Sequence, residues 1–146
     1  MSGATTATGM SGANNSIGTW KLNVAKSKST ITNPVKSQTD VREATPDGGI
    51  KITRTEQLTD GTAVTFSFTF KYDGKEYPVT GAAFDFISAK RIDANTTTFE
   101  ARKSGGKFHV TGQTVISKDG KTMTQTAKGT DAEGEPATAK NVFDKQ

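Results

Sequence analysis

Residues 50–70 read IKITRTEQLTDGTAVTFSFTF and contain the clearest β-hairpin pattern in the chain. Apolar and polar side chains alternate on both sides of a turn at 59–61. A three-residue turn with Gly61 in the left-handed conformation would merge the two apolar faces. The charged residues Arg54 and Glu56 then lie on that apolar face. The pairs that this turn predicts are Ile50 with Phe70, Ile52 with Phe68, Arg54 with Phe66, and Glu56 with Val64.

From residue 17 onward, short alternating runs and tight turns repeat along the chain. The other turn signals are PDGG at 46–49, DG at 73–74, DAN at 93–95, SGG at 104–106, KDGK at 118–121 and DAEG at 131–134. Asp-Gly and Gly-Gly supply the positive φ values that tight hairpins need. The pattern predicts an all-β, antiparallel up-and-down meander, packed as a sandwich or closed into a barrel of about 8–10 strands.

The length of each turn predicts which residues share the inner face of the meander. The expected pairs are Glu43 with Ile52 and Val41 with Arg54, Phe70 with Tyr77 and Phe68 with Val79, Ala101 with Val110 and Phe99 with Gly112, and Ile116 with Met123 and Thr114 with Gln125. The apolar members of this face are Val41, Ile50, Ile52, Leu58, Val64, Phe66, Phe68, Phe70, Tyr77, Val79, Ile87, Phe99, Val110, Ile116 and Met123. The polar side chains embedded among them are Glu43, Arg54, Glu56, Thr114 and Gln125.

The composition bounds the class of protein. The 146 residues fit a single domain at 17–146 after a flexible Gly/Ala/Ser/Thr-rich tail at 1–16. The tail is not an intact signal peptide, but it fits the remnant of one in a periplasmic or secreted protein. No apolar run could span a membrane, and the net charge of +4 is too dispersed for a nucleic-acid binder. There are no cysteines, which excludes disulfides and thiolate chemistry.

Both ends of this domain resemble a known superfamily. The first strand, SIGTWKLNV at 16–24, carries a Gly-x-Trp motif, and AKNVFDKQ at 139–146 is similar to the Arg-x-Tyr ending of fatty-acid-binding proteins. The chain resembles the calycins, meaning lipocalins and fatty-acid-binding proteins. It also resembles small bacterial lipocalin-like domains, through KYDGKEYPVTG at 71–81, KRIDANT at 90–96 and SKDGKTMT at 117–124. The resemblance implies that Trp20 plugs the closed end of a barrel.

Two features depart from that superfamily. The Arg and Tyr that hold a ligand carboxylate in fatty-acid-binding proteins correspond here to Asn141 and Phe143. The helical pair that follows their first strand corresponds to AKSKSTITNPVKSQ at 25–38, which predicts an irregular crossing loop. The same carboxylate clamp is therefore not expected.

Arg54 and Glu56 allow two interpretations. They could pair with each other or sit at a wet end of the barrel, with a structural role only. Alternatively, they are polar anchors in an aromatic-lined pocket, which is how small-molecule sites are commonly built. The candidate ligand-binding residues are Glu43, Arg54, Glu56, Phe66, Phe68, Phe70, Tyr77, Phe99, Thr114, Met123, Gln125, Asn141 and Phe143.

Three functions follow from these patterns. The first is binding, and transport, of a small hydrophobic or aromatic molecule inside the barrel. The second is a small β-barrel enzyme of the isomerase, cyclase or dehydratase type, with Glu56 as acid or base and Arg54 steadying negative charge. The third is a structural domain with a filled interior.

Other chemistries lack the residues they need. His109 is the only histidine and is expected on the outer face, so no metal site and no cofactor are predicted. No nucleophile motif or phosphate loop is present. Phe84 and Phe86 are expected to flank a ligand portal or form a dimer contact, unless a bulge turns one of them into the core. The protein is therefore expected to be a monomer or a weak dimer.

Overall fold

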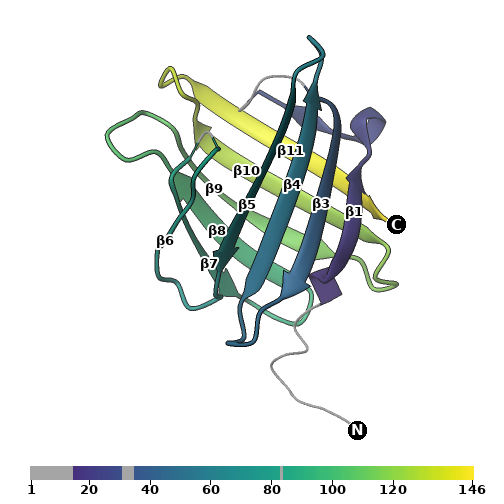
Figure 1. Ribbon diagram of the computed structural model, residues 1–146. Coiled ribbons are helices and arrows are strands. Elements are labelled where there is room, and N and C mark those ends of the chain that lie inside the picture. Colours follow the sequence, from purple (N-terminus) through teal and green to yellow (C-terminus); the bar gives the residue numbers. More distant parts are fainter. Residues whose placement is uncertain (1–14, 31–34, 83) are drawn as a thin grey trace, which may run out of the picture.

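The computed structural model describes residues 15–30, 35–82 and 84–146. They form one antiparallel sheet whose strands follow the order β5-β4-β3-β1-β11-β10-β9-β8-β7-β6, with β2 added beside β11. In Figure 1, β3, β4 and β5 form a layer in front of β8 to β11, which cross behind them. The elements are β1 (Gly18–Leu22), η2 (Val24–Lys26), β2 (Lys28–Ser29), β3 (Val35–Ala44), β4 (Ile50–Leu58), β5 (Ala63–Phe70), β6 (Tyr77–Pro78), β7 (Phe86–Arg91), β8 (Thr96–Arg102), β9 (His109–Ile116), β10 (Thr122–Thr130) and β11 (Pro136–Lys145).

The first strand closes the sheet against the last. β1 pairs with β3 on one side and with β11 on the other, where Trp20 lies opposite Lys145. The predicted meander and its closure are therefore confirmed. β5 and β6 stand at the two ends of the strand order, so the barrel is nearly closed, with its gap between these strands.

The gap contradicts the predicted hairpin at 73–74, which would have paired Phe70 with Tyr77. The Asp73 carboxylate instead accepts hydrogen bonds from the Lys75 N–H (3.0 Å) and the Tyr77 hydroxyl (2.6 Å), which folds this segment on itself. The backbone then turns to β7 rather than β5: the Gly74 N–H donates to the carbonyl of Ala89 at 2.9 Å. Side chains, not backbone pairing, fill the space between β5 and β7.

Three predicted turns are confirmed. Around the turn at 59–61, Ile50 lies opposite Phe70 and Arg54 opposite Phe66, and Gly61 has φ +91°. The pairs predicted for β8 with β9 and for β9 with β10 are also found. The inner face of these strands is thus the one that the alternation indicates.

The register between β3 and β4 was predicted wrongly by one residue. The loop spans 45–49 rather than the four residues of PDGG, because the Thr45 N–H donates to the carbonyl of Gly49 and the Thr45 hydroxyl accepts from the Gly49 N–H. A slip of one residue exchanges the two faces of a strand. Val41 and Glu43, which were expected inside, therefore face outward. The inward residues are Gln38, Asp40 and Arg42, all buried.

One end of the barrel is sealed by a cluster around Trp20. Its members are Trp20, Leu22, Ile116, Met123 and Phe143. Trp20 is fully buried, and its indole N–H donates to the carbonyl of Ser16 at 2.9 Å. Satisfying this polar group lets the large ring be buried without an unpaired donor. The tryptophan therefore occupies the position that the Gly-x-Trp resemblance implies.

The described residues between β1 and β3 contain no α-helix. They include the short η2 turn and β2, which pairs with β11 through Ser29 and Lys28. The prediction of a loop up to residue 38 is wrong at its end, since β3 already begins at Val35. Residues 31–34 and 1–14, the latter in the predicted tail, lie outside the described residues. Within the described part of the chain, no helix has the length and hydropathy needed to cross a membrane.

Candidate ligand-binding cavity

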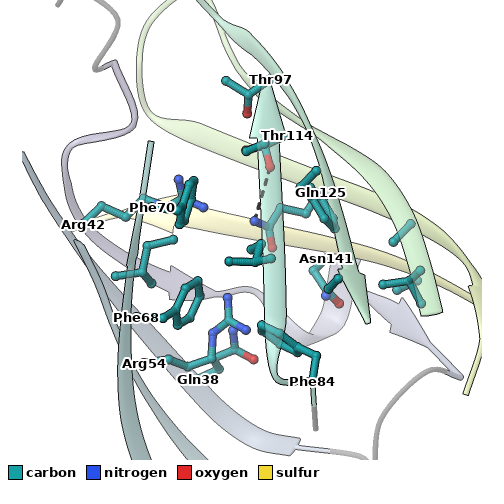
Figure 2. Close-up of a pocket in the computed structure, with 18 of the residues that line it drawn as sticks. Gln38, Arg42, Arg54, Phe68, Phe70, Phe84, Thr97, Thr114, Gln125 and Asn141 are labelled. Atoms are coloured by element: carbon teal, nitrogen blue, oxygen red, sulfur yellow. Dashed lines mark hydrogen bonds between the residues drawn. The ribbon is translucent and has the colours of Figure 1, made fainter. Parts of the chain in front are cut away.

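A cavity of about 140 Å³ lies inside the barrel. Its walls come from the inward faces of β3, β4 and β5 on one side and of β7 to β11 on the other. Figure 2 shows Arg42, Arg54 and Phe68 on one wall and, across from them, Thr114, Gln125 and Asn141. The interior is therefore not completely filled by side chains.

Phenylalanine rings make most of the apolar wall. The Phe68 ring stacks on Phe66 and Phe70 at 6.0 Å between centroids and meets Phe84 edge-on at 5.8 Å. Phe84 in turn stacks on Phe108 at 6.2 Å. Such ring pairs add about 0.5–1.5 kcal/mol each beyond the area they bury. The wall is thus a connected set of rings that runs across the gap between β5 and β7.

Phe84 and Phe86, whose positions the sequence left undecided, point in different directions. Phe84 precedes β7 and turns into the cavity, which is the bulge alternative for this residue. Phe86 is the first residue of β7, and the Arg102 guanidinium covers its ring at 4.6 Å. The pair does not form a joint outer patch, so only Phe86 remains a candidate for a surface contact.

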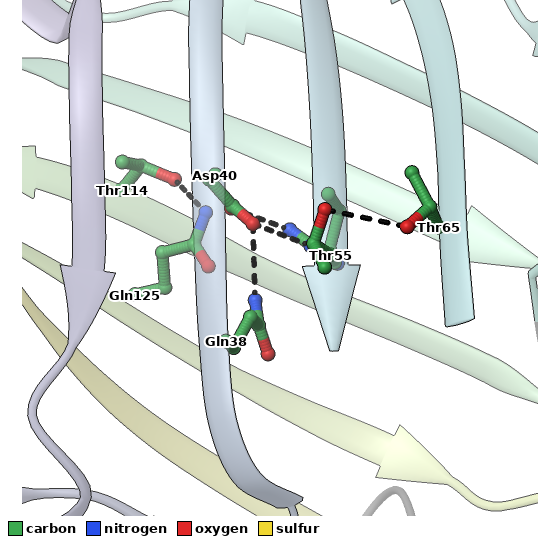
Figure 3. A network of polar contacts seen from close by, with 7 residues as sticks. Gln38, Asp40, Thr55, Thr65, Thr114 and Gln125 are labelled. Atoms are coloured by element: carbon green, nitrogen blue, oxygen red, sulfur yellow. Dashed lines mark hydrogen bonds and ion pairs between the residues drawn. The ribbon is translucent and has the colours of Figure 1, made fainter. Parts of the chain in front are cut away.

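The cavity holds an ion pair that the register prediction missed. Asp40 on β3 lies opposite Arg54 on β4, and the contact is two-pronged: Nε to Oδ1 and Nη2 to Oδ2, each 2.9 Å. The Asp40 side chain is fully buried, and the Arg54 side chain is 16% exposed. Gln38 adds a third donor to Asp40 Oδ1 at 3.2 Å (Figure 3). Of the alternatives that the sequence left open for Arg54, a structural pair with Glu56 is therefore not the one found.

The charge of Arg54 is well compensated. Burial lowers the pKa of the Arg54 guanidinium, but the charge and hydrogen bonds of Asp40, together with the charge of Glu56, outweigh burial and raise the pKa overall. The guanidinium also lies 5.9 Å from the ring centre of Phe66 and 5.8 Å from that of Phe68. Arg54 thus stands between a carboxylate and aromatic rings, both of which favour its positive charge.

Arg42 is in a different position. It is 4% exposed and lines the cavity, and its buried Nε has no hydrogen-bond partner. Burial lowers the pKa of its guanidinium, and the favourable effects of Tyr72 and Asp40 offset burial only in part. The charge of Arg42 is therefore incompletely compensated by the protein.

Glu56 lines the cavity and is half-buried. Burial raises the pKa of its carboxyl group, and Asp40 raises it further, while Arg54 opposes this shift without cancelling it. The environment therefore favours the protonated form, which can donate a hydrogen bond.

Neutral polar groups complete the opposite wall. Gln125 on β10 donates to the Thr114 hydroxyl on β9 at 3.4 Å, as Figures 2 and 3 show. Asn141 on β11 also lines the cavity. The last strand thus offers an amide where fatty-acid-binding proteins are expected to offer a charged clamp.

Not all predicted ligand-binding residues reach the cavity. The structure brings together around it Arg54, Glu56, Phe68, Phe70, Phe99, Thr114, Gln125 and Asn141. The other five lie elsewhere: Glu43 on the outer face, Phe66 beside Arg54, Tyr77 bonded to Asp73, and Met123 and Phe143 in the Trp20 cluster.

Sequence reasoning missed several residues of the cavity. They are Gln38, Arg42, Tyr72 and Phe108. The alternation of Gln38, Asp40 and Arg42 was the available signal, because three polar residues at a spacing of two mark one face of a strand. The true partner of Arg54 lay in that row.

His109 is exposed and contacts the carboxylate of Glu100, so its predicted outward position is confirmed. In the part of the chain that the structure describes, no three His, Cys, Asp or Glu side chains gather as metal ligands would.

Solved structures with the same architecture are found across nearly the whole chain. A fatty-acid-binding protein from Schistosoma mansoni, in complex with arachidonic acid, superposes with a TM-score of 0.64 at 15% identity, over 92% of this chain and 98% of that one. The chain has a calycin fold of the fatty-acid-binding-protein type. The calycin resemblance of the sequence is thereby confirmed at the level of fold.

Two further solved structures share this fold. The fluorescent protein UnaG gives a TM-score of 0.59 at 13% identity, over 89% of this chain and 96% of its own. The zebrafish ileal bile acid-binding protein, complexed with cholic acid, gives a TM-score of 0.51 at 14% identity, over 91% of this chain and 100% of its own. No protein-family model matches the chain, and no curated protein matches it.

Proposed function

We propose that this calycin barrel binds one small hydrophobic or aromatic molecule in its interior, as a carrier would. The observation that carries the proposal is the cavity itself, with a wall of phenylalanine rings and a few polar groups on facing strands. Small-molecule sites have this composition. The arachidonic acid and cholic acid complexes of similarly folded proteins support the same kind of ligand.

The volume limits the size of that ligand. A cavity of about 140 Å³ has room for a group of roughly the size of one benzene ring. A ligand with a longer body needs a side chain of the wall to move. Phe84 is suited to this because it lies outside the regular strands and borders the gap beside β5.

The polar groups favour binding over catalysis. An enzyme that used Glu56 and Arg54 would need a guanidinium free to stabilise developing charge. The Nε and Nη2 groups of Arg54 already donate to the Asp40 carboxylate, and both side chains are largely shielded from water. A barrel with a completely filled interior is disfavoured by the cavity.

A pair of matched variants tests the proposal. Ala139 lines the cavity and Thr138, its neighbour on β11, is exposed, so Ala139→Phe places a ring inside and Thr138→Phe places the same ring outside. Binding of benzene, a neutral molecule of the size that the cavity can hold, is followed by calorimetric titration. We expect Ala139→Phe to abolish binding and Thr138→Phe to preserve it. Equal binding by both variants, or none by the unmodified protein, would reject interior binding.

A further inference from the structure

The inner face of β3 and β4 carries two arginines and two carboxylates, and the carboxylates serve Arg54 more than Arg42. Asp40 and Glu56 both favour the charge of Arg54, whereas of these two only Asp40 acts on Arg42. Arg42 and Arg54 both point inward, whereas Asp40 is the only fully buried carboxylate beside them. Both oxygens of Asp40 are bonded to Arg54. No ion pair among the described residues includes Arg42.

A guanidinium cannot escape this situation by losing its proton, because it stays charged at any pH that a protein tolerates. Burying a charge without a partner costs several kcal/mol. The Tyr72 side chain hydrogen-bonds to Arg42, but it leaves the buried Nε unpaired. What Arg42 lacks is a further acceptor for its guanidinium, and an anionic group inside the cavity would supply one.

The surroundings of Arg42 define the rest of such a ligand. Arg42 lies opposite Ile52, and the rings of Phe68 and Phe70 follow on the next strand. The opposite wall offers the neutral amide of Asn141 and the Gln125–Thr114 pair. The charged part of the cavity is therefore the wall formed by β3 and β4, and the facing wall is apolar or neutral.

We propose that Arg42 is an anion anchor, and that the ligand carries one anionic group, a carboxylate in the simplest case, on a compact apolar body. The proposal rests on the interior binding proposed above and specifies its ligand class. The anionic group accepts hydrogen bonds from the Arg42 guanidinium, and the apolar body lies against Phe68 and Phe84. The anchor thus belongs to β3, whereas the last strand contributes only Asn141.

Among the described residues that line the cavity, Glu56 is the only one with a carboxyl group, and its carboxylate repels an anionic ligand when it is ionised. Replacing it with glutamine keeps its shape and removes that repulsion. A ligand held by Arg42 should then bind more tightly if it is anionic, and equally well if it is neutral.

The test compares two ligands of nearly equal size, 3-phenylpropanoate and 3-phenylpropan-1-ol, by calorimetric titration at pH 7. Proteins to compare are the unmodified chain, Arg42→Met, Arg42→Lys and, as a control on the outer face, Arg102→Met. We expect the carboxylate to bind the unmodified chain and Arg102→Met at least about tenfold more tightly than the alcohol, since hydrogen bonds to charged groups are worth more than neutral ones. Arg42→Met should abolish this preference without weakening the alcohol, and Arg42→Lys should retain part of it.

The outcomes separate the two proposals. If both ligands bind the unmodified chain equally well, or if Arg42→Met keeps the preference, the anchor is refuted and interior binding stands. If neither ligand binds, both proposals fail for ligands of this size. Arg42→Met removes a buried charge without a large loss of volume, so it should fold, and its thermal unfolding checks this directly.

Discussion

Removing the carboxylate of Asp40 should destabilise the fold more than any other single change in charge. The isosteric variant Asp40→Asn leaves the buried Arg42 and the partly buried Arg54 without the carboxylate that favours both of their charges. Two hydrogen bonds of 2.9 Å to a charged partner lose most of their strength, and the contact from Gln38 at 3.2 Å loses its ionic acceptor.

The expected cost follows from burial. Breaking a buried pair by removing one partner costs about 3–5 kcal/mol, because an uncompensated charge remains. For a domain of this size, each 1 kcal/mol lowers the melting temperature by about 2–4 °C. We therefore expect Asp40→Asn to lower it by roughly 6–20 °C, a large part of a typical total stability of about 5–15 kcal/mol.

The outer surface supplies a matched control. Arg102 holds Glu76 in the same two-pronged geometry, but the side chains are 36% and 43% exposed. Glu76→Gln should cost less than about 1 kcal/mol, because water solvates the remaining charge. The double variant Asp40→Leu/Arg54→Met should recover most of the loss, since an apolar pair can replace a buried ion pair.

Urea unfolding of the four proteins measures these differences, provided that the slope with denaturant is unchanged among them. If Asp40→Asn lowers the free energy of unfolding by no more than Glu76→Gln does, the buried pair of Asp40 and Arg54 is no more important for stability than an exposed one. A double variant as unstable as Asp40→Asn alone would refute this reasoning as well.

Three further changes have defined outcomes. The raised pKa of Glu56 means that the folded state favours the protonated carboxyl group. Its contribution to the stability of the fold is complete below the ordinary pKa of 4.5 and is lost as the pH rises through the pKa of Glu56 in the folded state. Glu56→Gln should therefore raise the melting temperature at pH 7 but not at pH 4, and a uniform change at both pH values would contradict this. At Gly112, an added Cβ would lie 2.0 Å from the carbonyl oxygen of Thr126, so Gly112→Ala should lower the free energy of unfolding in urea by about 3 kcal/mol. Gly120→Ala, at a turn with open space, should lower it by only about 1 kcal/mol. Equal costs would show that β9 and β10 are less tightly packed than described. Phe84→Ala should lose about 3 kcal/mol of stability yet bind naphthalene better relative to benzene, and an unchanged affinity ratio would remove Phe84 from the cavity wall.

Much of the fold could be predicted from local patterns, because most turns of this barrel are short and carry glycine where the backbone requires it. Gly61 at φ +91° and Gly120 at φ +72° fixed the registers that place Phe68 and Thr114 inside. The gap beside β5 was not predictable in this way. It depends on the Asp73 carboxylate binding Tyr77, which competes with a hairpin that the same residues also permit.

The site was harder to predict because it depends on the register between β3 and β4, which a single turn sets. At 45–49, two consecutive glycines allow a four-residue or a five-residue loop, and the apolar pattern of β3 favoured the wrong one by placing Val41 inside. The observed register puts Asp40 beside Arg54 instead. An unpaired guanidinium on this face would cost about 3–5 kcal/mol, which is more than the roughly 1.5–3 kcal/mol gained by burying one valine. A search for a carboxylate opposite Arg54 would have found Asp40, and with it the row of residues that contains Arg42.

The most direct test of the account is a crystal structure of the protein with saturating 3-phenylpropanoate. We expect the phenyl ring inside the barrel against Phe68 and Phe84, with the carboxylate within hydrogen-bond distance of the Arg42 guanidinium. A ligand found only on the outer surface, or one inside with its carboxylate at Asn141 and Arg42 untouched, would contradict it.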